Sequence, residues 1–384
     1  MFRTFRIHRL IASLALVAML APWSLAQEAA APAKLGPKIQ LAILLDTSNS
    51  MDGLINQARA QLWKIVNDLA LAKYDGKRPD LEVAVYEYGN NNLKAETHWV
   101  RMVVPLTNDL DKVSEALFAL KTNGGNEFCG AVIGAATREL AWSDDKNALK
   151  LIYIAGNEPF SQGPVAYADT CKAAVTRGVT VSTIFCGPIQ TGISTHWQHG
   201  ASLADGSFMA IDQNRAVAAV AAPQDKELAE LGVKLNNTYC AYGSADKQRE
   251  SAERQVAQDS NAAAAAPGAL SSRAQFKASA QYRNADWDLV DALKENKVKL
   301  EDLKPEQLPE NLRKLSKDEL AKHVAEKATE RKALQEKIQA LSKARDSYLA
   351  EANKKQAGEA GDSLDKAIIE STRKQAEKKN FKFE

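Results

Sequence analysis

The segment Asp46-Thr47-Ser48-Asn49-Ser50 brings one carboxylate and two serine hydroxyls together within a few residues. It directly follows a nearly continuous apolar run, residues 38–45, and precedes an amphipathic stretch. Ligands of parallel sheets collect beyond the carboxyl ends of the strands. Hard oxygen donors of this kind suit Mg²⁺, or Ca²⁺ and Mn²⁺, with water completing the coordination shell. A simpler interpretation is that Asp46 and the serines cap the following helix through its free N–H groups.

The elements that must position this segment follow an alternating order along the chain. Short apolar runs alternate with amphipathic stretches, which predicts an α/β domain with a Rossmann-like, doubly wound, mainly parallel sheet over residues 38–243. We expect strands over residues 38–45, 81–88, 99–104, 149–155, 179–185 and 207–211. We expect helices over residues 53–72, 109–120, 131–141 and 165–177, and a further helix from about residue 225.

The sequence changes character after this domain. Residues 244–285 are polar and contain an alanine run, which predicts a linker or a poorly packed helix. Residues 286–384 are rich in Lys and Glu and predict a charged helical region, with a capping box at Ser316 and Glu319. One apolar stripe of this region consists of Leu334, Ile338, Leu341 and Tyr348. A stripe this short indicates docking against a neighbouring helix in preference to a self-standing coiled coil.

The N-terminal residues have the pattern of a secretory signal. Residues 1–26 combine three arginines with an apolar run and end in Ser24-Leu25-Ala26, and residues 27–37 form an Ala- and Pro-rich leader. We therefore expect export to the periplasm or the cell exterior, although an uncleaved membrane anchor is the competing interpretation. The mature chain has no later apolar run long enough for a transmembrane segment. Its basic and acidic residues nearly balance, which gives no support for nucleic acid as a partner.

The Asp-x-Ser-x-Ser spacing at Asp46, Ser48 and Ser50 resembles the metal-ion-dependent adhesion site of the von Willebrand factor type A (VWA) family. Residues 122–127 are similar to the second loop of that site, in which a glycine pair precedes a threonine ligand. Residues 151–159 resemble the strand and loop that end in Thr-Asp-Gly-Glu-Pro. The resemblance covers residues 38–243 and implies a protein-binding module of the adhesion type, which holds a partner and has no enzymatic activity.

The same resemblance implies a metal site with an altered set of ligands. Asn126 stands in the place of the family's threonine, and Gly156 in the place of its aspartate. The implied ligands are therefore Asp46, Ser48, Ser50, Asn126 and Asn157, with Glu158 as the alternative to Asn157. With fewer anionic ligands, a bound Mg²⁺ would keep more positive charge and favour an acidic side chain of a protein partner. The other possibility is an empty site whose face binds its partner through ordinary contacts.

Four cysteines, Cys129, Cys171, Cys186 and Cys240, would meet an oxidising compartment after export. Their spacing matches no zinc-ligand pattern. In the expected topology, Cys171 lies early in a helix and Cys186 ends a strand, both near the ligand edge of the sheet. We expect a bridge between Cys171 and Cys186, with Cys129 as a competing partner and separate buried thiols as the alternative.

Two other classes of function remain open. An envelope structural or assembly protein would act through its helical region, with the adhesion-type site unused. A metal-assisted hydrolase would need a general base near the cation, for which Glu158 or His196 is available. No histidine falls in a catalytic triad or a metal-hydrolase motif, so we expect no catalytic residues.

Overall fold

The structure is a computed structural model that describes residues 36–214, 220–355 and 363–383. The predicted signal peptide, residues 1–26, lies outside the described residues, as does nearly all of the leader. The strands are β1 (Ile39–Asp46), β2 (Ala72–Tyr74), β3 (Leu81–Tyr88), β4 (Val100–Thr107), β5 (Leu149–Gly156), β6 (Thr180–Cys186), β7 (Asp205–Ile211) and β8 (Phe381–Phe383). The helices of the first half are α1 (Asp52–Ala70), α2 (Leu110–Ala119), α3 (Cys129–Glu139), α4 (Tyr167–Thr176), α5 (Ile189–Ser194) and α6 (Trp197–Leu203). Those of the second half are α7 (Asp225–Asn236), α8 (Ala245–Ala265), α9 (Ala269–Lys277), α10 (Leu289–Lys294), α11 (Lys317–Lys355) and α12 (Leu364–Glu377).

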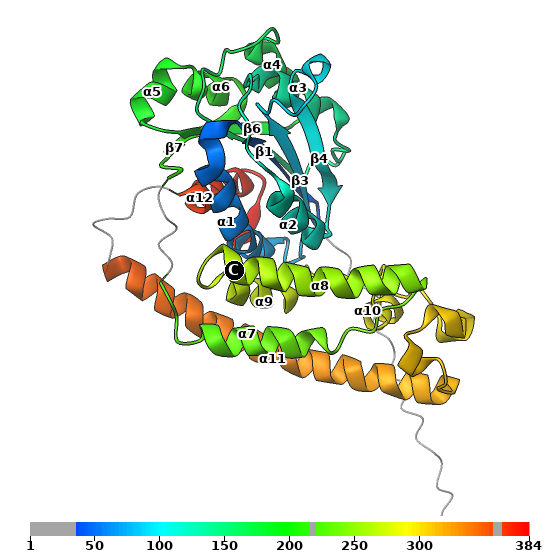
Figure 1. Ribbon diagram of the computed structural model, residues 1–384. Helices are drawn as coiled ribbons and strands as arrows, with labels where there is room; N and C mark the ends of the chain where they lie inside the picture. The colour runs from blue at the N-terminus through cyan, green and yellow to red at the C-terminus, as the bar shows by residue number, and fades with distance from the viewer. Residues whose placement is uncertain (1–35, 215–219, 356–362, 384) are drawn as a thin grey trace, which may run out of the picture. The chain divides into compact units, whose positions relative to one another are not determined.

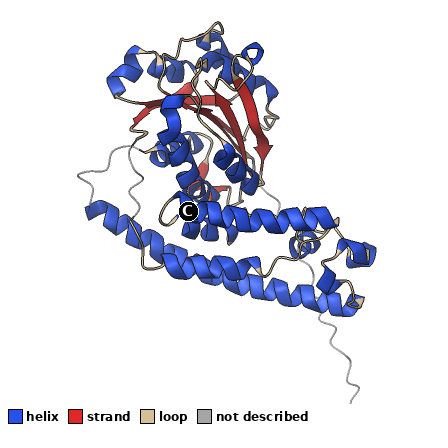
Figure 2. Cartoon of the chain, viewed as in Figure 1, coloured by secondary structure: helices blue, strands red, loops and turns tan. Residues whose placement is uncertain are grey.

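Six strands form one sheet in the order β4-β3-β1-β5-β6-β7, and helices cover both of its faces (Figure 2). β3 and β4 pair antiparallel, and the other neighbours pair parallel. Side chains alternate along β1, so that Leu41, Ile43 and Leu45 belong to one core and Ala42 and Leu44 to the other. The predicted α/β fold, a doubly wound and mainly parallel sheet with a helical extension, is confirmed.

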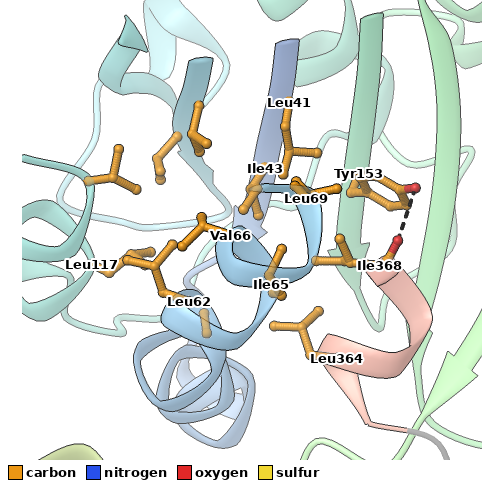
Figure 3. Packing of buried hydrophobic residues seen from close by; sticks show 14 of the residues in the cluster. Leu41, Ile43, Leu62, Ile65, Val66, Leu69, Leu117, Tyr153, Leu364 and Ile368 are labelled. Carbon is orange, nitrogen blue, oxygen red and sulfur yellow. Dashed lines mark hydrogen bonds between the residues drawn. The ribbon is translucent and has the colours of Figure 1, made fainter. Parts of the chain in front are cut away.

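Helix α12 completes one face of this sheet, although it comes from the far end of the chain. Leu364 and Ile368 of α12 pack beside Ile65 of α1 in the same buried cluster (Figure 3). Tyr153 of β5 joins this contact, because its hydroxyl lies 2.9 Å from the Thr372 hydroxyl. β8 then pairs antiparallel with β2, directly after α1. Residues 364–383 therefore belong to the α/β core, and the helices from α7 to α11 are inserted before this last element.

The segment 244–285, which we expected to be a linker or a poorly packed helix, instead forms the packed helices α8 and α9. α9 contacts both α1 and α7, and α8 contacts α2 (Figure 1). Arg273 of α9 is fully buried and forms ion pairs with Asp111 of α2 and, at 2.5 Å, with Asp259 of α8. Buried charges are stable only when they are paired in this way, so the ion pairs fix α8 and α9 against the α/β core.

Helix α11 runs along α7, as the apolar stripe indicated. Ile338 is fully buried against Leu228, Leu231 and Leu235 of α7, whereas Tyr348, at the far end of the stripe, is exposed. The capping box is also confirmed: the Ser316 N–H donates to Glu319 Oε2 at 2.8 Å, and the Glu319 N–H donates to Ser316 Oγ at 3.3 Å. In the described part of the chain, no helix has both the length and the apolar character needed to cross a membrane.

Candidate functional site

Four loops meet where β1, β3 and β5 end, and hydrogen bonds from backbone and asparagine side-chain groups hold three of them together. The Asn123 N–H donates to Thr47 O at 2.9 Å, and the Gly124 N–H donates to Asn49 Oδ1 at 2.7 Å. Asn90 Nδ2 bridges to Lys121 O at 2.8 Å. Because these three loops are tied to one another, the side chains that project from them are held by a fixed framework.

The glycines of these loops allow the backbones to approach one another closely. A Cβ atom on Gly125 would lie 2.5 Å from Gly89 O, and Gly89 itself has a φ angle of +78°. A Cβ atom on Gly89 would also lie 2.8 Å from Asp46 Oδ1 and 2.7 Å from Glu127 Cγ. Larger residues at these positions would therefore separate the loops and displace the carboxylates beside them.

Four of the five predicted ligands lie in one hydrogen-bonded chain. Asp46 Oδ1 accepts the Ser48 N–H at 2.8 Å, and Ser48 Oγ lies 3.5 Å from Ser50 Oγ. Asn157 Nδ2 then donates to Ser50 Oγ at 3.0 Å. Asp46 and Ser48 are buried, Asn157 is half-buried and Ser50 is exposed, so the cluster reaches the surface at Ser50. The helix-capping alternative finds little support, because Ser48 makes no side-chain cap at the start of the 3-10 helix Asn49–Met51.

The second carboxylate of the cluster is Glu127, which was not among the predicted ligands. Asn126, the residue chosen from the motif, is exposed, and no hydrogen bond or ion pair within the described residues brings it to Asp46. Glu127 is buried beside Asp46 and Ser48. Burial and the neighbouring Glu127 carboxyl raise the pKa of Asp46 well above its ordinary value, and burial raises the pKa of Glu127 as well. A carboxylate two residues after the glycine pair Gly124-Gly125 is the signal that could have identified it.

Three oxygens of this cluster are buried without a donor. Among the described residues, none donates a hydrogen bond to Asp46 Oδ2, Glu127 Oε2 or Asn157 Oδ1. Buried acceptors of this kind are rare, because each one costs about 1–3 kcal/mol when it lacks a partner. No set of three or more His, Cys, Asp or Glu side chains in the described part of the chain is grouped to hold a metal ion. The cluster instead offers two carboxylates with unpartnered oxygens, beside neutral hydroxyl and amide oxygens, and these donor types fit a hard divalent cation whose shell is completed by water.

Gly156 occupies the position of the family's aspartate because Tyr88 fills the adjoining space. A Cβ atom on Gly156 would lie 2.4 Å from the Tyr88 hydroxyl oxygen. That hydroxyl is fixed, because it donates to Ala155 O at 3.0 Å from a fully buried ring. The second carboxyl group of the cluster therefore belongs to Glu127, in the loop before α3, and not to a residue at the end of β5.

The two residues considered as general bases lie on the rim of this edge. Glu158 and His196 are both exposed, and the Glu158 carbonyl accepts the Trp197 indole N–H at 2.8 Å. Trp197 is fully buried between Phe160 and Phe185, with ring centroids 4.9 and 5.7 Å away. Trp197 thus holds the loop after β5, which carries Glu158, against the start of α6, which His196 precedes.

The expected bridge between Cys171 and Cys186 is wrong. Cys129, Cys171, Cys186 and Cys240 all lie within the described residues and are all buried free thiols. Cys171 of α4 packs in the core on one face of the sheet, whereas Cys186 of β6 packs in the core on the other face. The sheet itself therefore separates the two sulfur atoms. Burial raises the pKa of the Cys171 thiol to about 12, which makes it a poor nucleophile.

No curated protein matches the chain. Among solved structures, the VWA domain of SpRpn10 is 18% identical with a TM-score of 0.35, and the match covers 45% of this chain and 88% of that one. The conserved hypothetical protein BatB from Bacteroides thetaiotaomicron is 14% identical with a TM-score of 0.35, over 58% of this chain and 99% of BatB. Proximal thread matrix protein 1 from the mussel byssus, with a zinc-occupied MIDAS motif, is 13% identical with a TM-score of 0.33, over 45% of this chain and 41% of that one. The family model of the von Willebrand factor type A domain matches residues 40–192, and the chain therefore contains a domain of that family.

Proposed function

We propose that this protein is an exported binding module that holds a protein partner at the carboxyl edge of its VWA sheet, through a divalent cation. Asp46 and Glu127 would hold the cation, with oxygens from Ser48, Ser50 and Asn157. The observation that carries the proposal is the buried pair of carboxyl groups, each with one oxygen that receives no hydrogen bond from the described residues. Mg²⁺ is the first candidate for the cation, with Ca²⁺ and Mn²⁺ as alternatives.

The electrostatics of the pair supports a cation. Burial raises the pKa of both Asp46 and Glu127, and the adjacent Glu127 carboxyl raises that of Asp46 further, through a hydrogen bond and through its charge. A divalent cation would remove the repulsion and supply the missing partner of each orphaned oxygen. Part of its coordination shell would face outward beside Ser50, the exposed member of the cluster. An acidic side chain of a protein partner would fit there.

The proposal assigns no enzymatic activity to the chain. A hydrolase would need a base held toward the cation, whereas Glu158 and His196 are exposed rim residues. The rival role, assembly through the helical region, needs a test other than removal of residues 286–384. That truncation would also remove α12, whose Leu364 and Ile368 belong to the core beneath the sheet. Substitutions on the exposed face of α11 leave this core intact and are the appropriate comparison.

The test is capture of partners by the immobilised full-length protein from the envelope fraction of its native cell. Capture should require Mg²⁺, be abolished by a chelator, and be lost in Asp46→Asn and Glu127→Gln. Glu230→Gln removes an exposed carboxylate from α7, outside the loops of this edge, and serves as the matched control. Capture that survives both the chelator and the two site variants would contradict the proposal. If capture is instead lost only in α11 surface variants, it supports the assembly role.

A further inference from the structure

A second polar feature lies at the opposite edge of the sheet, where β5 and β6 begin. Here a pocket of about 430 Å³ is lined by residues that precede β5, by the end of α4 and by the turn after α12. Four of its lining side chains are cationic: Lys146, Lys150, Arg177 and Lys379. Asp144 is the one carboxylate among the lining residues. The positive charges in this pocket therefore outnumber the negative charge, in a chain whose overall charge is nearly balanced.

Backbone oxygens hold three of these cations in place. Lys150 Nζ donates to Ser143 O at 3.1 Å and to Arg177 O at 2.6 Å. The Arg177 guanidinium donates to Thr137 O, and Lys379 Nζ donates to Lys146 O at 2.7 Å. Carbonyl oxygens fix the position of a charged group but do not neutralise it. The pocket thus presents a preorganised set of charges that lacks an equal number of counter-charges.

The cations lie close enough to affect one another. The pKa of Lys150 is lowered, first by burial and then by the charges of Lys379 and Arg177, against the opposite effect of Asp144. Neighbouring like charges reduce stability unless an anion joins them, and such arrangements are concentrated at functional sites. The three residues come from separate parts of the chain, so sequence proximity does not account for their meeting.

We propose that this pocket binds a small, multiply charged oxyanion of the phosphate type. Its volume is sufficient for pyrophosphate or a small phosphate ester. The forked guanidinium of Arg177 and the point charges of the lysines are the groups that proteins use for such oxyanions. The excess of positive charge favours a polyvalent anion over a monovalent one such as acetate. Because Lys379 follows α12, the bound anion would also tie the C-terminal turn to the segments before β5 and β6.

The site is distinct from the proposed cation site, because parallel strands place their beginnings and ends at opposite edges of the sheet. The two sites also require ligands of opposite charge. Asp46→Asn should therefore leave the affinity of this pocket for an oxyanion unchanged. If one proposal fails, the other can still be tested separately.

The test is calorimetric titration of the full-length protein at constant ionic strength with pyrophosphate, inorganic phosphate, glycerol phosphate and acetate. Pyrophosphate should bind saturably and at least about ten-fold more tightly than acetate. Arg177→Gln and Lys379→Gln should each weaken that binding about ten-fold, the loss expected for one charge-assisted contact. Lys322→Gln, an exposed position on α11, should leave it unchanged. Tighter binding of glycerol phosphate than of pyrophosphate would assign the pocket to esters, and the reverse order to inorganic anions.

The proposal fails if pyrophosphate gives no saturable heat. It also fails if Arg177→Gln and Lys379→Gln, with unchanged circular dichroism and melting temperature, bind pyrophosphate like the unsubstituted protein. A loss of equal size in Lys322→Gln would show that only the net charge of the protein matters, and would overturn it as well.

Discussion

Gly156→Ala tests whether position 156 must be glycine because the Tyr88 hydroxyl fills the space beside it. The new Cβ would lie 2.4 Å from the Tyr88 hydroxyl oxygen and 3.2 Å from Asp46 Oδ2, closer than atoms in a packed core tolerate. Tyr88 is fully buried and cannot move without weakening its hydrogen bond to Ala155 O. Overpacking of a core costs about 1–3 kcal/mol. We expect Gly156→Ala to lower the free energy of unfolding by this amount.

The mechanism is specific to one oxygen atom, so a double-mutant cycle can isolate it. Tyr88→Phe removes that oxygen at a cost of about 1 kcal/mol for the lost hydrogen bond. In Tyr88→Phe with Gly156→Ala, the combined loss should then be smaller than the sum of the two single losses by about 1 kcal/mol or more. Urea unfolding followed by tryptophan fluorescence measures all four proteins. Additivity within about 0.5 kcal/mol would refute the steric explanation.

Three other perturbations test the remaining parts of the account. The first is a change of pH in the presence of a chelator. Raising the pH from about 4 to 7 should lower the free energy of unfolding of the unsubstituted protein relative to that of Glu127→Gln. The reason is that burial raises the pKa of Glu127 in the folded state, and such a carboxyl stabilises the folded state only while it holds its proton. With saturating Mg²⁺ at pH 7, the unsubstituted protein should instead be the more stable of the two in urea unfolding. If the two proteins give parallel pH profiles and Mg²⁺ does not change which is more stable, the cation site is contradicted. Arg273→Met should lower the free energy of unfolding by about 3–5 kcal/mol, because it leaves Asp111 buried without its ion-pair partner. A loss below about 1 kcal/mol would show that this ion pair is dispensable. Ile368→Ala on α12 should lower the free energy of unfolding by about 2–5 kcal/mol and speed proteolysis of the α/β core. Glu370→Ala, at an exposed position of the same helix, should do neither. Equal behaviour of the two variants would mean that α12 is not part of that core.

The sheet could be predicted from the sequence because its signals are apolar. Residues 38–45 and 81–88 are continuous or alternating apolar runs, and they correspond to β1 and β3 within one residue at each end. Such patterns give the fold class directly, since a strand buried on both faces is apolar at most of its positions.

The helices after the sheet were harder to predict because their buried faces are polar. Burial of α8 and α9 depends on paired charges, above all Arg273 with Asp111 and Asp259, so the segment has the composition of an exposed linker. Helix α12 uses hydroxyls for part of its buried face, such as Thr372 beside Tyr153. Hydrophobic periodicity underestimates burial wherever ion pairs or hydroxyl pairs replace apolar contacts.

At the site, the motif identified the loops but not every side chain. Asp46, Ser48 and Ser50 were predicted from one strand end and do lie together. In the second loop, the side chain that lies beside Asp46 is Glu127, one position after the predicted Asn126, because only the folded backbone determines which of two adjacent side chains turns inward. A shift of one residue reverses the direction of a side chain in extended backbone, and sequence alone does not fix it.

The most direct test of the cation site is calorimetric titration of the full-length protein with Mn²⁺ and Mg²⁺, repeated on Asp46→Ala and Glu127→Gln. The unsubstituted protein should bind one equivalent of cation saturably, Asp46→Ala should give no binding heat, and Glu127→Gln should bind at least about ten-fold more weakly. Identical titrations of the unsubstituted protein and Asp46→Ala, whether silent or saturable, would contradict the account.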